Sequence, residues 1–182
     1  MPFTNISESG LESLIVKWLV EQNHYEQGHS HDYSMEYALD TVRLLRFLKD
    51  TQPEAVEKLQ LETHPLKRAQ FFSRVRDEIT KRGIIDVLRK GVKVYPASLV
   101  LYYMTPSMNN PTAAQLYAKN IFSVTRQLHF SPDATKLSLD LCIFINGLPV
   151  ITFELKNRLT KQNVDDAVYQ YQHDRSPKEL LY

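Results

Sequence analysis

Two mostly apolar segments separated by Asn146-Gly147 constrain the fold of this chain more than any other feature. Residues 137–145 and 149–155 have the length of β-strands, and Asn-Gly is the strongest short signal for a hairpin turn. Apolar side chains occupy both faces of these segments, as the neighbours Ile143 and Phe144 illustrate. Strands that are apolar on both faces belong in the middle of a covered sheet. The sequence therefore predicts a central hairpin in a sheet flanked by helices.

The order of the other segments indicates a mixed α/β or α+β domain. A single domain is expected over residues 1–182, with a helical part at about 9–90 and a sheet at about 92–175. Residues 23–33 are polar and are expected to form a loop. We expect a first helix that begins near Ser9, and further helices at 35–49, 53–61, 65–82, 84–90 and 163–173. Further strands are expected at 92–95, 98–103 and 120–130.

Composition excludes several classes of protein. The net charge of +1 gives no global basic field, so any binding to phosphates must come from a local patch. The single cysteine, Cys142, rules out a disulfide framework and is expected to lie in the core. The five glycines form neither a Walker pattern nor a dinucleotide fingerprint. Because no signal peptide and no membrane-spanning run is apparent, we expect a cytoplasmic protein without a membrane partner.

The hairpin also carries a pattern of charges that suits metal-dependent chemistry. Asp140 lies on its first strand, and Glu154 precedes Lys156 by two residues at the end of its second strand. The two carboxylates and the backbone carbonyl of Leu155 are oxygen donors of the kind that Mg²⁺ prefers. Lys156 could orient or deprotonate a water beside a phosphodiester. The alternative is ordinary ion pairing at the surface, but two charges inside an apolar strand are costly unless they have partners.

The register of the hairpin decides whether the acids meet. A two-residue loop at Asn146-Gly147 would pair Ile145 with Leu148, and Asp140 and Glu154 would then face opposite sides. A three-residue loop of residues 146–148 would pair Ile145 with Pro149 and would bring the two acids together. We therefore predict the three-residue loop, or a bulge with the same effect.

At these residues the chain resembles the PD-(D/E)xK nuclease superfamily. More narrowly, it resembles the N-terminal nuclease region of the R (restriction) subunit of type I restriction endonucleases. The matching segments are 139–149, 150–157, 120–128 and 163–175. The resemblance implies a restriction-endonuclease-like fold, in which a central mixed β-sheet is flanked by helices and preceded by a helical region.

The resemblance also implies roles for individual residues. Asp140, Glu154 and Lys156 would be the catalytic trio, with Asp140, Glu154 and the Leu155 carbonyl at the metal. Gln170 would open the family's Q-x-x-x-Y motif, although Asp174 stands in place of its tyrosine. An acid of the first helix often approaches the metal in this superfamily. Glu8 and Glu12 are the candidates for that acid, although Glu12 could instead close a capping box with Ser9. Arg158 and Lys161 are the candidates for contacts with the DNA backbone.

The implied activity is that of a type I site-specific deoxyribonuclease. Mg²⁺ would be the cofactor, with Mn²⁺ as a substitute, and double-stranded DNA and the modification and specificity subunits would be the partners. ATP would serve only the full-length subunit, because this chain lacks the family's motor and is expected to be its isolated nuclease domain. The alternatives are a degenerate nuclease fold that binds DNA or partner subunits without cutting, and a stand-alone nuclease outside restriction.

Overall fold

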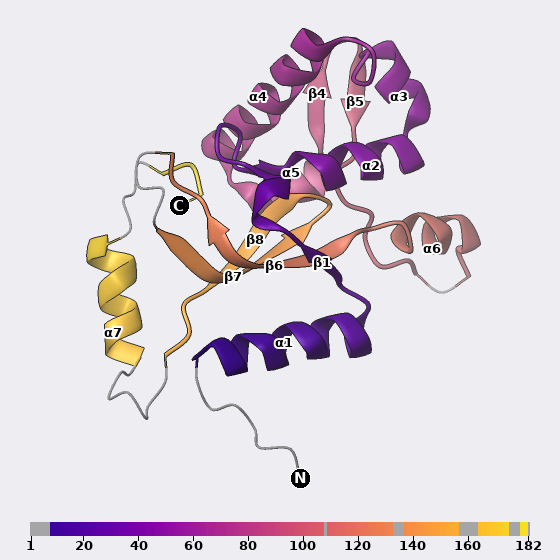
Figure 1. Cartoon of the computed structure of the whole chain (residues 1–182). Helices are drawn as coiled ribbons and strands as arrows, with labels where there is room; N and C mark the ends of the chain where they lie inside the picture. Colours follow the sequence, from indigo (N-terminus) through magenta and orange to yellow (C-terminus); the bar gives the residue numbers. More distant parts are fainter. Residues whose placement is uncertain (1–7, 108, 133–136, 157–163, 175–178, 182) are drawn as a thin grey trace.

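A computed structural model describes residues 8–107, 109–132, 137–156, 164–174 and 179–181. The molecule is layered around a four-stranded sheet (Figure 1). Helix α1 (Glu8–Asn23) lies against one face of the sheet, and the helices between residues 41 and 90 lie on the other side. Among the described residues, no helix combines the length and the apolar character that a membrane crossing requires.

The central sheet is mixed, which confirms the predicted fold class. Its order is β1 (Glu26–Gly28), β6 (Phe122–His129), β7 (Ser138–Ile145) and β8 (Leu148–Phe153). Strand β1 runs parallel to β6, whereas β6, β7 and β8 are antiparallel. Four short strands form two separate hairpin-like pairs, which are β2 (Tyr33–Ser34) with β3 (Leu39–Asp40), and β4 (Val92–Val94) with β5 (Ala97–Leu99).

Most helices begin and end where the capping signals predict. Gly83 and Gly91 have φ angles of 79° and 67°, and they end α4 and α5 because such angles favour glycine. The remaining turns of helix are a 3-10 segment at Ser30–Asp32 and a π-helical segment at Gln170–Asp174. The helices after α1 are α2 (Thr41–Thr51), α3 (Pro53–Lys58), α4 (Pro65–Arg82), α5 (Ile84–Lys90), α6 (Pro111–Tyr117) and α7 (Val164–Tyr169).

Several local expectations are wrong, among them the strand predicted over 98–103, which ends at Leu99. The predicted loop at 23–33 contains β1, whose three polar residues pair with β6 through their backbones and show no apolar pattern. The helix predicted over 35–49 begins only at Thr41. The carboxylate of Asp40 accepts a hydrogen bond of 2.9 Å from the Arg43 N–H and caps the helix there. Helix α6, which was not predicted, begins at a similar cap provided by Asn110.

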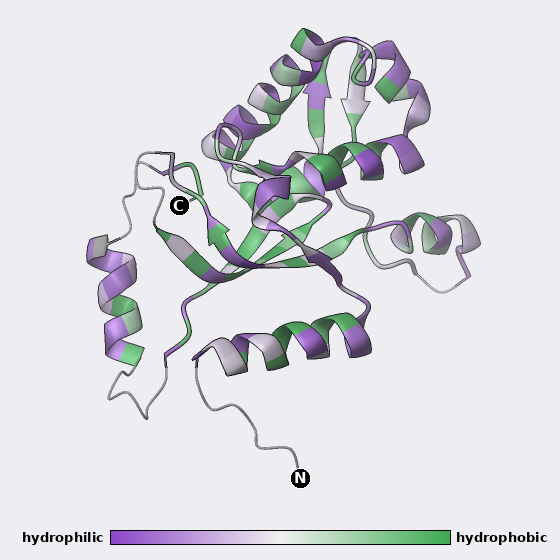
Figure 2. Ribbon diagram, viewed as in Figure 1, coloured by the Kyte–Doolittle hydropathy of each residue, from purple (hydrophilic) through white to green (hydrophobic). Residues whose placement is uncertain are grey.

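Apolar residues fill the space on both sides of the sheet, as the hydropathy colours in Figure 2 show along the strands. Under α1, Val16 and Leu19 pack against Val124, Leu141 and Ile143. The main core lies on the other side, where α2, α4 and α5 meet the start of β8. Its large, fully buried members include Phe47, Phe71, Leu44, Leu48 and Leu148. A smaller cluster joins the ends of β6 and β7 to β2 and comprises Tyr33, Leu128, Leu139, Cys142 and Phe144. Strand β7 is interior to the sheet and largely buried, which confirms the prediction for the first hairpin strand. The prediction is wrong for β8, which lies at the edge of the described sheet and leaves Ile151 50% exposed.

The hairpin reaches the predicted register through a bulge, which was the second of the two predicted routes. The three-residue loop is wrong, because Asn146 and Gly147 form a two-residue turn with φ angles of 51° and 84°, and Ile145 pairs with Leu148. The pairing then shifts by one residue at Val150 on β8, so that Ile143 pairs with Ile151. Beyond this bulge, the two strands pair in the predicted register.

The turn itself is buried, which is unusual for a hairpin loop. The side chain of Asn146 donates to the Leu101 carbonyl at 2.9 Å and accepts from the Ile121 N–H at 2.6 Å. The carbonyl of Gly147 accepts from the Asp40 N–H at 2.8 Å, at the beginning of α2. The turn is therefore tied to its neighbours by hydrogen bonds that satisfy its polar groups.

Candidate active site

Asp140 on β7 lies beside the segment that leaves β8. The last paired residues of the two strands are Leu141 and Phe153, and one further step in the same register places Asp140 opposite Glu154. The Leu155 N–H donates to Asp140 Oδ2 at 2.6 Å. The Asp140 carboxylate therefore contacts the backbone between Glu154 and Lys156, as the predicted register requires.

Glu154 and Lys156 are neighbours along this segment. The distance from Lys156 Nζ to Glu154 Oε1 is 3.5 Å, and the two side chains are only 10% and 8% exposed. Such burial distinguishes them from a surface ion pair, in which both charged groups would remain in water. Burying charged groups costs free energy unless they have partners. The burial of Glu154 and Lys156 therefore indicates that the pair has a functional or a structural role.

Glu12 reaches the site from α1. Its side chain is 4% exposed, and its Oε2 accepts from Arg126 Nη2 at 3.1 Å and from Arg126 Nε at 3.2 Å. The capping-box interpretation is wrong, because α1 already begins at Glu8 and Ser9 lies inside it. Of the two acids proposed on the first helix, Glu12 is the one that the described contacts link to Asp140.

That link is made by Gln127 on β6, which the sequence analysis did not single out. Gln127 Nε2 lies 2.9 Å from Glu12 Oε1 and 3.4 Å from Asp140 Oδ1. The strand pairs on either side, Arg126 with Leu141 and Leu128 with Leu139, place Gln127 directly opposite Asp140. A glutamine in a predicted strand carries no signal of its own, and only the pairing of β6 with β7 could have identified it.

The helical segment after β8 contacts the sheet through Tyr171. Its hydroxyl lies 3.0 Å from Thr152 Oγ1 on β8. Gln170, at the start of the π-helical segment, has a buried Oε1 for which the described part of the chain provides no hydrogen-bond partner. Arg158, Lys161 and the side chain of Asp174 lie outside the described residues, so their expected roles stay predictions.

The donors of the site suit a hard cation that keeps part of its water shell. Within the described ranges, no three His, Cys, Asp or Glu side chains converge as metal ligands would. Asp140, Glu154 and the Leu155 carbonyl would therefore be the protein's contribution. This set fits Mg²⁺, which is commonly bound by one or two carboxylates and retains several waters.

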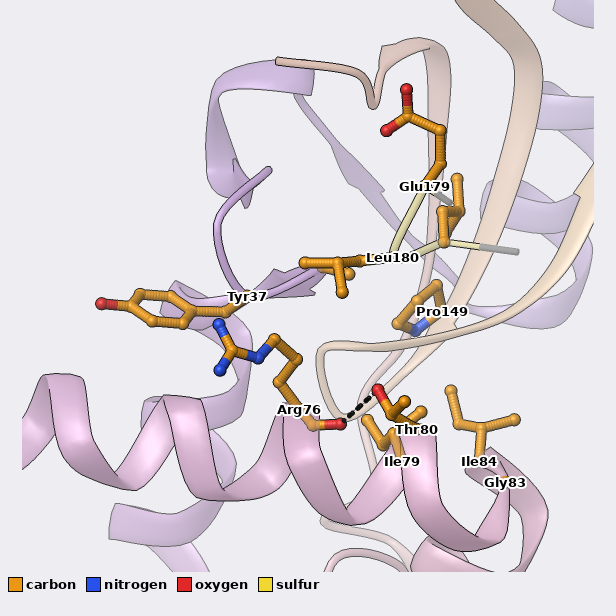
Figure 3. A pocket seen from close by; sticks show the side chains of 11 residues that line it. Tyr37, Arg76, Ile79, Thr80, Gly83, Ile84, Pro149, Glu179 and Leu180 are labelled. Atoms are coloured by element: carbon orange, nitrogen blue, oxygen red, sulfur yellow. Dashed lines mark hydrogen bonds between the residues drawn. The ribbon is translucent and has the colours of Figure 1, made fainter. Parts of the chain in front are cut away.

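A separate cavity of about 460 Å³ lies between α4 and the C-terminal segment (Figure 3). Arg76 and Thr80 of α4, Pro149 of β8 and Glu179 contribute to its wall. Asp140, Glu154 and Lys156 do not line this cavity, and it has no close pair of carboxylates. We therefore place the candidate chemistry at the end of the hairpin and not in this cavity.

Comparison with known proteins identifies a family. A family model described as the N terminus of the type I restriction enzyme R protein matches residues 5–181. No curated protein and no solved structure matches the chain. The matched range contains every residue of the site and nearly the whole sequence.

Proposed function

The chain belongs to the family of type I restriction enzyme R protein N-terminal domains, and from this premise we propose that it is the Mg²⁺-dependent DNA endonuclease domain of such a subunit. Its substrate would be double-stranded DNA. Its partners would be the modification and specificity subunits, and ATP would be used only by the motor of a full-length subunit. The recognition sequence would be chosen elsewhere in that complex.

The observation that carries this proposal is the meeting of the two hairpin strands at Asp140. The 2.6 Å hydrogen bond from the Leu155 N–H holds the carboxylate against the segment that bears Glu154 and Lys156. An acid on one strand and an acid followed two residues later by a lysine on the next are the arrangement that hydrolysis of a phosphodiester needs.

Each residue would have a distinct role in the reaction. Asp140, Glu154 and the Leu155 carbonyl would bind Mg²⁺. The bound ion would offset the charge of the phosphate and lower the pKa of a water. Lys156 Nζ would orient that water or take its proton, and its nearly buried position would keep it close to Glu154.

Metal binding is the first test of the proposal. Calorimetric titration with Mn²⁺ should show a site in the wild type that Asp140→Ala loses, because one of the two carboxylate ligands is gone. Asp50→Ala, which removes an exposed carboxylate from α2, is the matched control and should bind as the wild type does. Equal binding by the wild type and Asp140→Ala would contradict the proposed mechanism.

DNA cleavage is the second test. Lys156→Ala should still bind Mn²⁺ but should nick supercoiled DNA far more slowly, because general acid–base groups contribute about 10²–10⁴-fold. The assay should use the chain alone and the full R subunit assembled with its partner subunits and ATP. Unchanged cleavage by Lys156→Ala in the assembled enzyme would exclude this role for Lys156.

The alternative of a module that binds without cutting is favoured by one observation. Asp174 occupies the position at which the family's Q-x-x-x-Y motif has tyrosine. Such a module would bind duplex DNA or the partner subunits without metal-dependent nicking, even in the assembled enzyme. A stand-alone nuclease, in contrast, would nick DNA without partner subunits or ATP.

A further inference from the structure

We propose that Gln127 is a positioning residue, whose amide holds the Asp140 carboxylate relative to Glu12 and thereby sets the affinity of the site for its cation. This inference rests on the proposed function, because it concerns the same metal site. It adds a residue on β6 to a site otherwise built from the hairpin and α1.

The hydrogen bonds of Gln127 use every polar atom of its side chain. Its Oε1 accepts from Ser138 Oγ at 2.9 Å, which turns the opposite edge of the amide toward the two acids. Its Nε2 donates to Glu12 Oε1 at 2.9 Å and makes a longer contact of 3.4 Å with Asp140 Oδ1. A carboxamide has two donor hydrogens, so both are directed at the two acids, while its oxygen accepts from Ser138.

The backbone at Gln127 is strained at the place where the side chain touches the site. Its φ angle is 46°, in the left-handed region that non-glycine residues rarely adopt. That conformation costs about 1–2 kcal/mol for an ordinary residue. The pairing of β6 with β7 resumes at Leu128, so the deviation is confined to the residue opposite Asp140. Strain that is localised in this way is found preferentially at functional sites.

The lack of charge on Gln127 also suits a residue that positions the Asp140 carboxylate. Asp140 receives the Gln127 amide on Oδ1 and the Leu155 N–H on Oδ2, so neutral donors fix both of its oxygens. An arginine would fix the carboxylate equally well, but it would cancel the negative charge that attracts a cation. The nearby arginine, Arg126, contacts Glu12 Oε2 instead. Asp140 is therefore held in place by groups that carry no positive charge of their own.

The test replaces Gln127 with glycine. Gln127→Gly removes the amide and accepts the left-handed φ angle without strain, so the fold should be retained. Gln27→Gly on β1 is the matched control, because it makes the same change at an exposed side chain of the same sheet. The measurements are the calorimetric affinity for Mn²⁺, the thermal unfolding midpoint, and the nicking rate of the assembled enzyme as a function of Mn²⁺ concentration.

Gln127→Gly should bind Mn²⁺ about 10–100-fold more weakly than the wild type, as is usual when a residue that orients a metal ligand is removed. The Mn²⁺ concentration for half-maximal nicking should rise in parallel, while the rate at saturating Mn²⁺ falls much less. A purely structural role would lower the saturating rate and leave the metal dependence unchanged. Gln127→Asn tolerates the same backbone, but its amide is shorter, and it should shift the affinity in the same direction.

Two outcomes would overturn the inference, and they are distinguishable. If the wild type binds Mn²⁺ and both Gln127 variants bind it with unchanged affinity, the positioning role is excluded and the proposed function stands. If the wild type binds no Mn²⁺, the metal site itself is excluded, and this inference fails with it.

Discussion

At the scale of single residues, backbone conformation decides where the acids lie. Asn146 and Gly147 both adopt positive φ angles, and the resulting two-residue turn would by itself separate Asp140 from Glu154. The extra residue at Val150 restores the register beyond it. Two local features of opposite effect, a turn and a bulge, therefore determine the geometry of the candidate site together.

Gly147→Ala should destabilise the protein more than the same change at Gly83. Both glycines have positive φ angles, but a Cβ at residue 147 would lie 2.3 Å from the Asp40 carbonyl oxygen, whereas none of the described atoms lies within 4 Å of one at residue 83. We expect a loss of about 1–2 kcal/mol for Gly83→Ala and about 2–5 kcal/mol for Gly147→Ala, measured by urea unfolding. Equal losses would show that the turn yields without strain.

At the scale of elements, β6 connects α1 to the hairpin of β7 and β8. It pairs with β7 along its length, and its residues 126 and 127 both contact Glu12 of α1. The contact combines apolar packing of Val16 and Leu19 with one nearly buried carboxylate. Because the same carboxylate reaches toward Asp140 through Gln127, the seating of α1 and the geometry of the site are coupled.

A double-mutant cycle on Glu12 and Arg126 measures how much their contact contributes to the stability of the fold. Arg126→Leu should destabilise the protein by about 1–3 kcal/mol, because it leaves the buried Glu12 carboxylate with fewer donors; the estimate is reduced because Arg126 is 32% exposed. Adding Glu12→Leu should recover part of that loss, which urea unfolding can measure. The exposed pair Lys49 and Glu62 is the control and should show a smaller coupling. A cycle for Glu12 and Arg126 no larger than the control would contradict a structural role for the pair.

At the scale of the whole molecule, the sheet is covered on both sides and its centre is removed from water. Cys142 lies in the middle of β7 and is fully buried, and burial raises the pKa of its thiol. A buried, protonated thiol is a poor nucleophile. Since it is the only cysteine of the chain, it can report on opening of the whole fold.

Cys142 should react with a thiol reagent only when the protein unfolds globally. Stabilities of about 5–15 kcal/mol imply labelling at least about a thousandfold slower than in denatured protein. The rate can be followed with a chromogenic disulfide, and in Gly147→Ala it should rise about tenfold for each 1.4 kcal/mol of measured loss of stability. Native labelling at the rate of the denatured chain would place Cys142 on a locally open strand.

Much of the secondary structure could be predicted from local patterns. Asp140 lies beside the segment that bears Glu154 and Lys156, as the predicted register requires, and the catalytic role of the three residues stays a prediction. Proline at the start and glycine after the end define α4, Gly83 and Gly91 bound α5, and the Asn-Gly signal defines the hairpin. Strand β1 was not predicted, because three polar residues gain their structure only by pairing with β6. The start of α2 was misplaced for a similar reason, since residues 39 and 40 pair with β2 before Asp40 caps the helix.

The sequence alone determined the mixed α/β class, the hairpin and the residue types of the candidate site, because periodicity, turn residues and charge spacing are local properties of the chain. Only the tertiary structure decided which route gives the register, which first-helix acid faces Asp140, and that Gln127 joins them. These depend on contacts between α1, β6 and β7, segments more than a hundred residues apart at their extremes. Such contacts arise from packing and long-range pairing, which no local pattern encodes.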